Sequence, residues 1–570
     1  MQLDQHQQAA VDTTSARALV SAVPGSGKTL TLTHRFLKLV EEVPPSKIVL
    51  LTFTRHAARE IKARIGEKAG LAFIGTFHSF ALSIVRQWGK VQGWEPSWLG
   101  VLDDWTAMKE EWDVLVDVGL KSKRGGWSGV SWADKAGWEH YKARMLVDPA
   151  GESASASERE TYGPAWGALC GSLKSQNVLT YQTLIYEARK IMGMEYLAPE
   201  IRKNYRHFLV DECQDTDLGQ WSLMEDFEPD TIFAVGDIDQ SIYEWRGACP
   251  QNIIEFSKTA ERYTLPTTYR FGANVAEPAN TLIQRNMSRI PVTIKPADHL
   301  SGGLTYFAGE QAGITGVVDF ISSLVEDGAR ETDIAVIGRT HRQLDVAASQ
   351  LIAAGHTVDR ITPNDEMTKM PMMRAAMGYV RLACNPKDNR AFMAVAQHEG
   401  LTPEAILEIR KEALARGCSL SQCTRSIQPD TLESIQDHML QARVLSRLEI
   451  HEVKDAIQWL GDLMWTEGIT EIRELIEVFA MRGVQDKMPS APEGITVCTV
   501  HAAKGLEWPA VCVIGLTEGR WPSSGSIREG RLEEERRLAY VAITRAEKHL
   551  MIANTSTTKP ESMFMPEMKS

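Results

Sequence analysis

A glycine-rich segment ending in a lysine and a threonine offers the clearest chemistry in the chain, because residues 22–29 read AVPGSGKT. Backbone N–H groups of such a loop, at the start of a helix, bind phosphate. Lys28 is expected at the β- and γ-phosphates, and the Thr29 hydroxyl at Mg²⁺. The strict pattern begins with glycine where this chain has Ala22, so a glycine-rich turn before a helix is the plain alternative. The candidate cradle comprises Ala22, Gly25, Ser26, Gly27, Lys28 and Thr29.

Two adjacent carboxylates, Asp211 and Glu212, follow the apolar run 207–210 within the letters DECQD. Asp211 is expected to ligate Mg²⁺, and Glu212 to act as the base that positions an attacking water. A pair of acids at the end of a strand is also typical of a helix N-cap. The phosphate-binding loop earlier in the chain favours the catalytic interpretation.

Three arginines could supply positive charge to a transferring phosphoryl group. Arg270 follows Tyr269 in a polar loop. Arg537 and Arg545 lie eight residues apart in a helix predicted over 533–546, which places them near one face of that helix. Taken alone, arginines in such positions are more often surface residues.

Short β-rich runs, each followed by a loop and a helical pattern, must position these groups. Continuous apolar runs of this kind indicate buried parallel strands, and the alternation of strand and helix indicates α/β architecture. The runs are 18–22, 48–53, 208–210, 231–235, 334–337, 495–500 and 510–514.

The runs fall into two groups, and each group is split by a long, mostly helical interruption. This organisation predicts two cores that each carry an inserted helical domain. The first core is expected over 1–87 and 201–266 with its insertion at 88–200, and the second over 267–375 and 494–570 with its insertion at 376–493.

The two insertions differ in composition. The first holds nine of the fifteen tryptophans; these are expected in a hydrophobic core, with a partner-binding patch as the alternative. Its segment 151–160, GESASASERE, is typical of a mobile loop. In the second insertion, 403–416 and 450–465 have the spacing of amphipathic helices.

Composition narrows the class of protein. The 570 residues are 43% hydrophobic and 24% charged, which is typical of a soluble globular protein of about four domains. No run approaches the ~18 apolar residues of a membrane span and no signal-peptide pattern is present, so the expected location is cytoplasmic. The eight cysteines form no CxxC pair, which favours reduced thiols over a zinc site. A net charge of −12 argues against coating nucleic acid by bulk charge, but leaves room for a local basic groove.

Ten segments resemble, in order, the motifs of the UvrD/Rep/PcrA family of superfamily 1 DNA helicases. They are LDQHQQAAV (3–11), AVPGSGKT (22–29), LTFTRHAAREI (51–61), GTFHSF (75–80), VDECQDT (210–216), VGDIDQSIYEWRGA (235–248), TTYR (267–270), VIGRT (336–340), TVHAAKGLEWP (499–509) and EEERRLAYVAITRAEK (533–548).

The resemblance implies two RecA-like P-loop domains with parallel sheets, which use ATP and Mg²⁺. It assigns Gln7 to the adenine edge, Tyr269 to stacking on the base, and Glu507 to the ribose. Gln240 would link the state of the γ-phosphate to the DNA site. Arg270 would reach the γ-phosphate from the second core and Arg545 would be the arginine finger, with Arg537 also near the nucleotide.

The same resemblance implies contacts with single-stranded DNA. Aromatic side chains in or next to loops stack on bases at about 1–3 kcal/mol each, and arginines pair with phosphates. Core packing is the alternative for the aromatics. The implied DNA-binding residues are Phe53, Thr54, Thr76, His78, Tyr243, Trp245, Arg246, Arg339 and His501.

The implied activity is ATP-dependent movement along single-stranded DNA, with 3′ to 5′ polarity, acting at single/double-strand junctions in repair, replication or recombination. A DNA-stimulated ATPase subunit that licenses a partner nuclease is the alternative, and a non-catalytic DNA-binding scaffold is a third. The intact nucleotide residues argue against the scaffold. RNA remains open as a substrate, because stacking tolerates either sugar.

The chain departs from the family pattern at three places. Leu30 stands where the family has arginine after the phosphate loop, and Arg55-His56 follow TFT in place of Asn-Lys. The second insertion is shorter, and Glu399-Gly400-Leu401 replaces the Gly-Ile-Gly hairpin that grips duplex DNA. We therefore expect weaker docking on duplex DNA with translocation intact.

Overall fold

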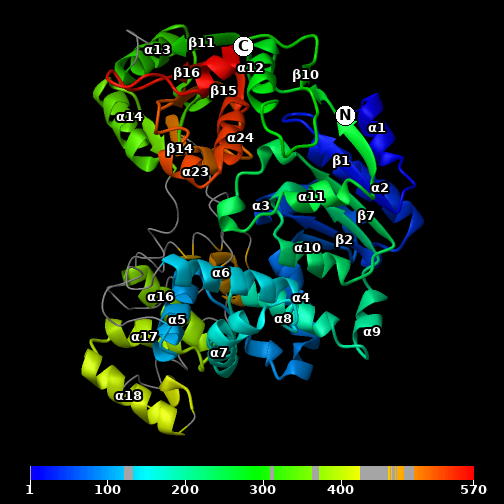
Figure 1. Cartoon of the computed structure of the whole chain (residues 1–570), viewed down its shortest axis with the longest axis vertical. Coiled ribbons are helices and arrows are strands. Elements are labelled where there is room, and N and C mark those ends of the chain that lie inside the picture. Colours follow the sequence, from blue (N-terminus) through cyan, green and yellow to red (C-terminus); the bar gives the residue numbers. More distant parts are fainter. Residues whose placement is uncertain are drawn as a thin grey trace. The chain divides into compact units, whose positions relative to one another are not determined.

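The computed structural model describes residues 2–120, 132–307, 313–361, 371–416, 418–423, 460–461, 464, 469, 472–480 and 493–569. The chain forms two compact units (Figure 1). Unit 1 comprises Met1–Phe77, Glu200–Pro363 and Gly483–Ser570, and unit 2 comprises His78–Pro199 and Asn364–Arg482.

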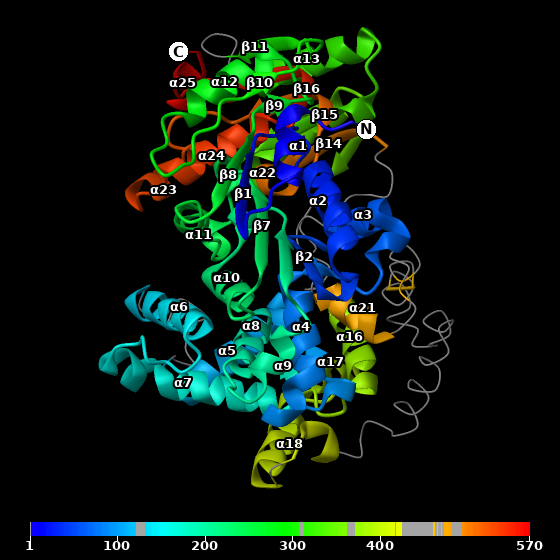
Figure 2. The same cartoon turned by 90° about the vertical axis from the view of Figure 1, so that its right-hand side faces the viewer.

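The first core of unit 1 is built on a parallel sheet in the order β3-β2-β6-β7-β1-β8. Its strands are β1 (Arg17–Ala22), β2 (Ile48–Thr52), β3 (Phe73–Thr76), β6 (His207–Val210), β7 (Thr231–Gly236) and β8 (Glu261–Leu265). Its helices are α1 (Gln5–Val11), α2 (Lys28–Glu42), α3 (Arg55–Ile65), α10 (Leu218–Glu225) and α11 (Gln251–Phe256). Helices α2 and α3 lie on one side of this sheet, and α10 and α11 on the other (Figure 2).

The second core has a parallel sheet in the order β11-β16-β15-β12-β14-β13. Its strands are β11 (Gly303–Phe307), β12 (Ile334–Gly338), β13 (Val358–Arg360), β14 (Ile495–Thr499), β15 (Trp508–Ile514) and β16 (Ala546–Ala553). Its helices are α12 (Ala273–Ile283), α13 (Ile314–Glu326), α14 (His341–Ala353), α22 (Val500–Ala503), α23 (Ser524–Arg528), α24 (Leu532–Ile543) and α25 (Phe564–Lys569). A short pair, β9 (Thr267–Thr268) and β10 (Lys295–Pro296), joins the two cores in sequence.

The central strands of both sheets are buried on their two faces, which explains their continuous apolar runs. In the second sheet, Val336 faces α13 and α14, whereas its neighbour Ile337 faces α12 and α24. Alternate residues of a strand point to opposite faces, so a strand covered on both sides is apolar at most of its positions. The α/β prediction with two RecA-like parallel sheets is therefore confirmed, and each of the seven predicted runs coincides with an observed strand to within two residues.

The segments outside the two cores are mostly helical, and they begin with α4, most of which lies in the range 1–87 predicted for the first core. They contain α4 (Phe77–Trp88), α5 (Asp104–Asp117), α6 (Trp132–Val147), α7 (Ala156–Ser175), α8 (Tyr181–Met192), α9 (Ala198–Arg202), α16 (Pro371–Cys384), α17 (Asn389–His398), α18 (Pro403–Arg416) and α21 (Ile472–Ala480), with a short pair of strands, β4 (Gly100–Val101) and β5 (Val178–Leu179). Helix α18 has the predicted bounds, whereas most of 450–465 lies outside the described residues.

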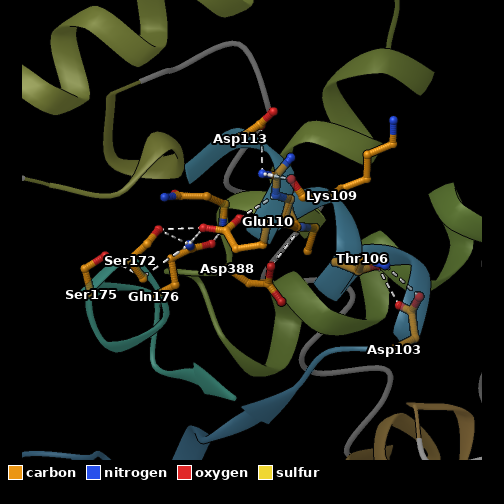
Figure 3. Close-up of polar contacts among 12 residues, drawn as sticks. Asp103, Thr106, Lys109, Glu110, Asp113, Ser172, Ser175, Gln176 and Asp388 are labelled. Carbon is orange, nitrogen blue, oxygen red and sulfur yellow. Dashed lines mark hydrogen bonds and ion pairs between the residues drawn. The ribbon is translucent and has the colours of Figure 1, made fainter. Parts of the chain in front are cut away.

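A buried polar network joins the two insertions within unit 2 (Figure 3). Glu110 of α5 accepts hydrogen bonds from Gln176 Nε2 at 2.9 Å and forms an ion pair with Arg390 of α17. Asn385 Nδ2 donates to the Gln176 carbonyl at 2.8 Å. Arg381 pairs with Asp388 at 2.7 Å, and both side chains are at most 9% exposed. Segments far apart in sequence thus satisfy each other's buried charges, as burial requires.

Two local predictions are corrected. Only the first part of 151–160 is a loop, because Ser155 forms a capping box with Glu158 and α7 begins at Ala156. That reciprocal cap satisfies two backbone donors and starts a helix within a sequence that otherwise resembles a loop. The helix predicted over 533–546 ends at Ile543, because the chain then enters β16 at Ala546.

The tryptophans of the first insertion include three that are buried, Trp94, Trp138 and Trp166, with exposed fractions of 2%, 3% and 4%. All three therefore contribute to the core of unit 2. The eight cysteines are free thiols. In the part of the chain that the structure describes, no helix has the length and apolar character needed to cross a membrane.

Candidate nucleotide and nucleic-acid site

The candidate residues gather at the carboxyl ends of the parallel strands, where open α/β sheets bind ligands. The phosphate-binding loop follows β1, Asp211 and Glu212 follow β6, and Gln240 follows β7. Thr54 and Thr76 lie at the ends of β2 and β3, whereas Arg339 and His501 follow β12 and β14 of the second sheet.

The phosphate-binding loop closes as a tight turn between β1 and α2. Gly25 and Gly27 have φ angles of +73° and +80°, which disfavour other residues. A Cβ added at Gly25 would lie 2.5 Å from Arg270 Cβ, and one at Gly27 would lie 2.7 Å from Gln7 Nε2. Both glycines therefore let neighbouring segments approach the loop backbone closely. Ala22, the departure from the strict pattern, is buried at the end of β1.

The proposed base-binding residues meet on one side of this loop. Gln7 Nε2 donates to the Ser26 carbonyl at 2.9 Å, while its Oε1 caps α1 by accepting from Asp4 N. The Tyr269 backbone N–H donates to the Gly25 carbonyl at 2.9 Å, and its hydroxyl donates to Asp4 Oδ2 at 2.7 Å. Tyr269 keeps 46% of its surface exposed. Its ring is thus available for stacking and Gln7 is close to the loop.

The two carboxylates lie beside the lysine of the loop. Lys28 Nζ is 3.8 Å from Glu212 Oε1, and Glu212 has a left-handed φ of 48°, a strained conformation for a residue other than glycine. Burial and the adjacent Glu212 raise the pKa of Asp211. Burial opposes ionisation of Glu212 as well, but Lys28 and Lys504 outweigh it and lower the pKa of Glu212. The pair therefore differs in ionisation, with Glu212 the stronger acid.

The oxygen donors present fit a hard cation such as Mg²⁺. Thr29 lies in the first turn of α2, and Asp211 is a buried carboxylate whose negative charge is crowded by Glu212. Within the described residues, no group of three or more His, Cys, Asp and Glu side chains forms a complete metal cage. Mg²⁺ is usually held by one or two carboxylates together with waters and phosphates, so this sparse donor set is suitable.

The second core presents two arginines to the same site. Arg545 is buried and lies beyond the end of α24, where its Nη2 donates to Gln240 Oε1 at 3.2 Å. Arg270 Nη1 donates to the Thr544 carbonyl at 3.1 Å, and its guanidinium pairs with Glu507. Burial, and then the neighbouring Arg270, lower the pKa of Arg545 to about 9. Two neighbouring cations that repel each other favour the binding of an anion between them.

A buried donor of this cluster also points to an anion. Arg270 Nε is buried and has no hydrogen-bond partner among the described residues. Such a group costs free energy unless a ligand or water satisfies it. A phosphate oxygen would supply the missing acceptor.

Arg537 differs from the prediction that placed it on one helix face with Arg545. Its Nε donates to the Ser241 carbonyl at 2.8 Å, and its guanidinium pairs with Glu244. Arg545, by contrast, reaches Gln240 from the turn after α24. The expected shared face fails because the helix ends before Arg545.

Several polar residues that sequence reasoning did not single out complete the site. Asp237 Oδ2 accepts from Gln240 Nε2 at 2.7 Å. Lys504 Nζ donates to Asp215 Oδ2 at 2.5 Å and to the Gln240 carbonyl at 2.7 Å. Burial raises the pKa of Asp215 to about 6, although Lys504 opposes this rise. Each of these residues lies inside a motif quoted above, but the sequence does not show which residues they contact.

The aromatic residues after Gln240 divide into one buried ring and one exposed ring. Tyr243 is 2% exposed, stacks on Phe53 at 5.1 Å between ring centroids, and donates from its hydroxyl to the His501 carbonyl. Trp245 is 57% exposed, and contacts the His501 ring edge-on. Arg246 lies 5.4 Å from the Trp245 ring centroid. Trp245 can therefore offer a free face to a base, whereas Tyr243 and Phe53 pack against each other.

The remaining DNA candidates have local partners. Thr54 caps α3 by accepting from Ala57 N at 3.1 Å, and Thr76 is buried at the end of β3. Arg339 pairs with the buried Glu535 at 3.0 Å. His78 belongs to unit 2, where its ring contacts Tyr181 edge-on at 4.6 Å. Burial, and then Arg339 and Lys504, lower the pKa of His501 to about 4, so His501 is neutral.

Comparison with known proteins agrees with this geometry. Residues 3–261 match the UvrD/REP helicase N-terminal domain, and residues 423–557 match the UvrD-like helicase C-terminal domain. The chain is 28% identical to the ATP-dependent DNA helicase PcrA of Bacillus subtilis (strain 168), over 99% of this chain and 85% of that protein. It is also 28% identical to DNA helicase II of Escherichia coli (strain K12), over 98% of this chain and 85% of that protein.

A phosphate-binding loop at one parallel sheet, with arginines presented from a second, defines a nucleotide-dependent enzyme of the RecA-like P-loop class. The two domain matches cover the phosphate-binding loop, Asp211 with Glu212, and Arg545, whereas Tyr269, Arg270 and Arg339 lie between the matched ranges. The chain belongs to the UvrD/Rep/PcrA family of helicases.

Proposed function

We propose that this protein is an ATP-dependent DNA helicase that translocates on single-stranded DNA. The observation that carries the proposal is the loop 237–246 after β7. At one end, Gln240 bonds to Arg545 and to Asp237. At the other end, Trp245 presents an exposed ring. A short loop of this kind links the phosphate site to a surface suited to bases.

In this proposal each residue of the nucleotide site has a defined task. Lys28 and Arg270 bind the phosphates, Arg545 stabilises charge in the transition state, and Glu212 orients the attacking water. Thr29 and Asp211 hold Mg²⁺, which neutralises phosphate charge when bound. Gln7, Tyr269 and Glu507 contact the nucleoside. Arg537 has no task in nucleotide binding in this proposal, because it contacts Ser241 and Glu244 instead.

Movement follows from this arrangement as part of the proposal. Two cores at 1–87 with 201–266, and at 267–375 with 494–570, close on ATP and reopen after hydrolysis. Bases then step past Trp245 with 3′ to 5′ polarity, in cytoplasmic DNA repair, replication or recombination. The insertions at 88–200 and 376–493 contact DNA junctions or a protein partner.

Weak engagement of duplex DNA by the second insertion is supported by local hydrogen bonding. The backbone N–H groups of Glu399, Gly400 and Leu401 donate to the carbonyls of Val395, Gln397 and Ala396, respectively. These bonds end α17 and use the donors that a phosphate-gripping hairpin would offer. Duplex affinity equal to that of PcrA at matched salt would refute this part of the proposal.

The first test is ATP hydrolysis with and without poly-dT. Strong stimulation by the strand is expected, with loss of activity in Lys28→Ala and Glu212→Gln. Arg330→Ala is a matched control, because Arg330 is 79% exposed and pairs with its near neighbour Asp333. Unwinding of 3′-tailed but not 5′-tailed duplexes would support the polarity. Hydrolysis that ignores the strand would refute the proposed function.

A further inference from the structure

The loop 237–246 of the first core is clamped by cations from the second core. Arg545 donates to the Gln240 side chain, Lys504 to the Gln240 carbonyl, and Arg537 to the Ser241 carbonyl. These three residues lie in the family motifs described above. A fourth cation, Arg289, lies in none of them.

Arg289 forms a buried, two-pronged ion pair with Asp239. Its Nε donates to Asp239 Oδ1 at 3.0 Å and its Nη2 to Oδ2 at 2.5 Å. The two side chains are 9% and 6% exposed. A bidentate guanidinium–carboxylate pair fixes orientation as well as distance. Asp239 therefore has one well-defined position relative to the second core.

The ion pair lies one residue from the glutamine of the nucleotide site. The Asp239 backbone N–H donates to Asp237 Oδ1 at 3.0 Å, and Gln240 Nε2 donates to Asp237 Oδ2 at 2.7 Å. The carboxylate of Asp237 thus bridges Asp239 and Gln240. The position of Asp239 is therefore coupled to the side-chain position of Gln240 through this shared acceptor.

The segment that carries Arg289 is anchored to α24 through Asn286. Asn286 Oδ1 accepts from Arg536 Nη1 at 2.7 Å, and Asn286 Nδ2 donates to the Glu533 carbonyl at 3.1 Å. Just beyond Arg289, Ile290 and Val292 line a small cavity together with Ala22, Val23 and Gly236–Asp239. The 286–292 segment therefore connects the helix that leads to Arg545 with the base of the phosphate loop.

We propose that Arg289 is a positioning residue for strand-stimulated ATP hydrolysis, which acts by holding Asp239 and thereby setting Gln240. This role rests on the proposed function. It requires that losing the ion pair uncouples hydrolysis from the strand without removing nucleotide binding. Misplacement of a catalytic group by about 1 Å can cost up to ~100-fold in rate.

A purely structural ion pair is the competing explanation, and two variants separate it from the proposed role. Arg289→Met with Asp239→Asn removes both charges, so this ion pair leaves no unpaired charge behind and the variant is expected to fold. Arg289→Lys keeps the charge but loses the two-pronged geometry. Arg330→Met is the matched control at an exposed arginine.

The experiment measures the melting temperature, the KM for ATP, and kcat with and without poly-dT for each full-length variant. The double variant is expected to melt near the wild type and keep its KM within about twofold, while stimulation by poly-dT falls at least tenfold. Stimulation of Arg289→Lys by poly-dT should lie between that of the wild type and that of the double variant. Full stimulation in the folded double variant, or in Arg289→Lys if the double variant does not fold, would overturn the role. A wild type without stimulation would instead refute the proposed function itself.

Discussion

Replacing Trp245 should weaken binding to single-stranded DNA, whereas replacing Tyr243 should lower thermal stability, although the two rings are only two residues apart. Trp245 is 57% exposed, so Trp245→Ala removes little buried surface. One base–aromatic stack contributes about 1–3 kcal/mol, which corresponds to a loss of affinity of about 5- to 150-fold. The thermal stability of this variant should stay close to that of the wild type.

Tyr243→Ala should instead lower stability. Tyr243 is 2% exposed, stacks on Phe53 and bonds to the His501 carbonyl. Truncation of a large buried aromatic side chain costs about 3–5 kcal/mol. The melting temperature should therefore drop clearly in this variant.

Fluorescence anisotropy with labelled poly-dT at fixed salt, alongside thermal unfolding, measures both effects. Tyr196→Ala is the control for removing an exposed aromatic elsewhere, since Tyr196 is 71% exposed. Poly-dT affinity within twofold of the wild type for Trp245→Ala would refute the assignment of this ring to base stacking. A stable Tyr243→Ala variant would contradict its role in packing.

Three further outcomes are expected. His501 has a pKa of about 4 in the folded protein against 6.5 when unfolded, so the unfolded state binds more protons between these pH values. The free energy of unfolding should therefore fall by up to about 3 kcal/mol as the pH drops from 6.5 to 4. Urea titrations should show a weaker dependence of stability on pH for His501→Gln. Arg390→Met leaves Glu110 unpaired and buried, and should destabilise unit 2 by about 3–5 kcal/mol, whereas adding Glu110→Gln should recover much of this loss in thermal unfolding. Gly25→Ala places a Cβ 2.5 Å from Arg270 and should abolish ATP hydrolysis, unlike Gly66→Ala, where φ is +63° but no atom lies within 4 Å.

Much of the architecture could be predicted because its physical signals are local. Strands buried on both faces are apolar at most positions, so runs such as 334–337 were recognisable one by one. The phosphate loop was equally local, since Gly25, Gly27 and Lys28 are neighbours in sequence. Weaker strands such as β8 (Glu261–Leu265) escaped prediction because most of their residues are exposed or half-buried.

Local pattern did not reveal which residues meet. Chain order shows neither that Arg545 leaves its helix to reach Gln240, nor that Arg289 finds a carboxylate fifty residues earlier. Burial is equally non-local: Tyr243 and Trp245 share one loop and similar chemistry, yet packing against Phe53 covers one ring and leaves the other exposed.

The sequence by itself thus determined the class of sheet and the family, because each depends on residue types at short spacing. Tertiary structure decided the contacts of the arginines, which of the two rings at Tyr243 and Trp245 is exposed, and the buried network between the insertions. Those depend on how distant segments pack, since the free energy of a buried charge or ring is set by the partners that folding brings to it.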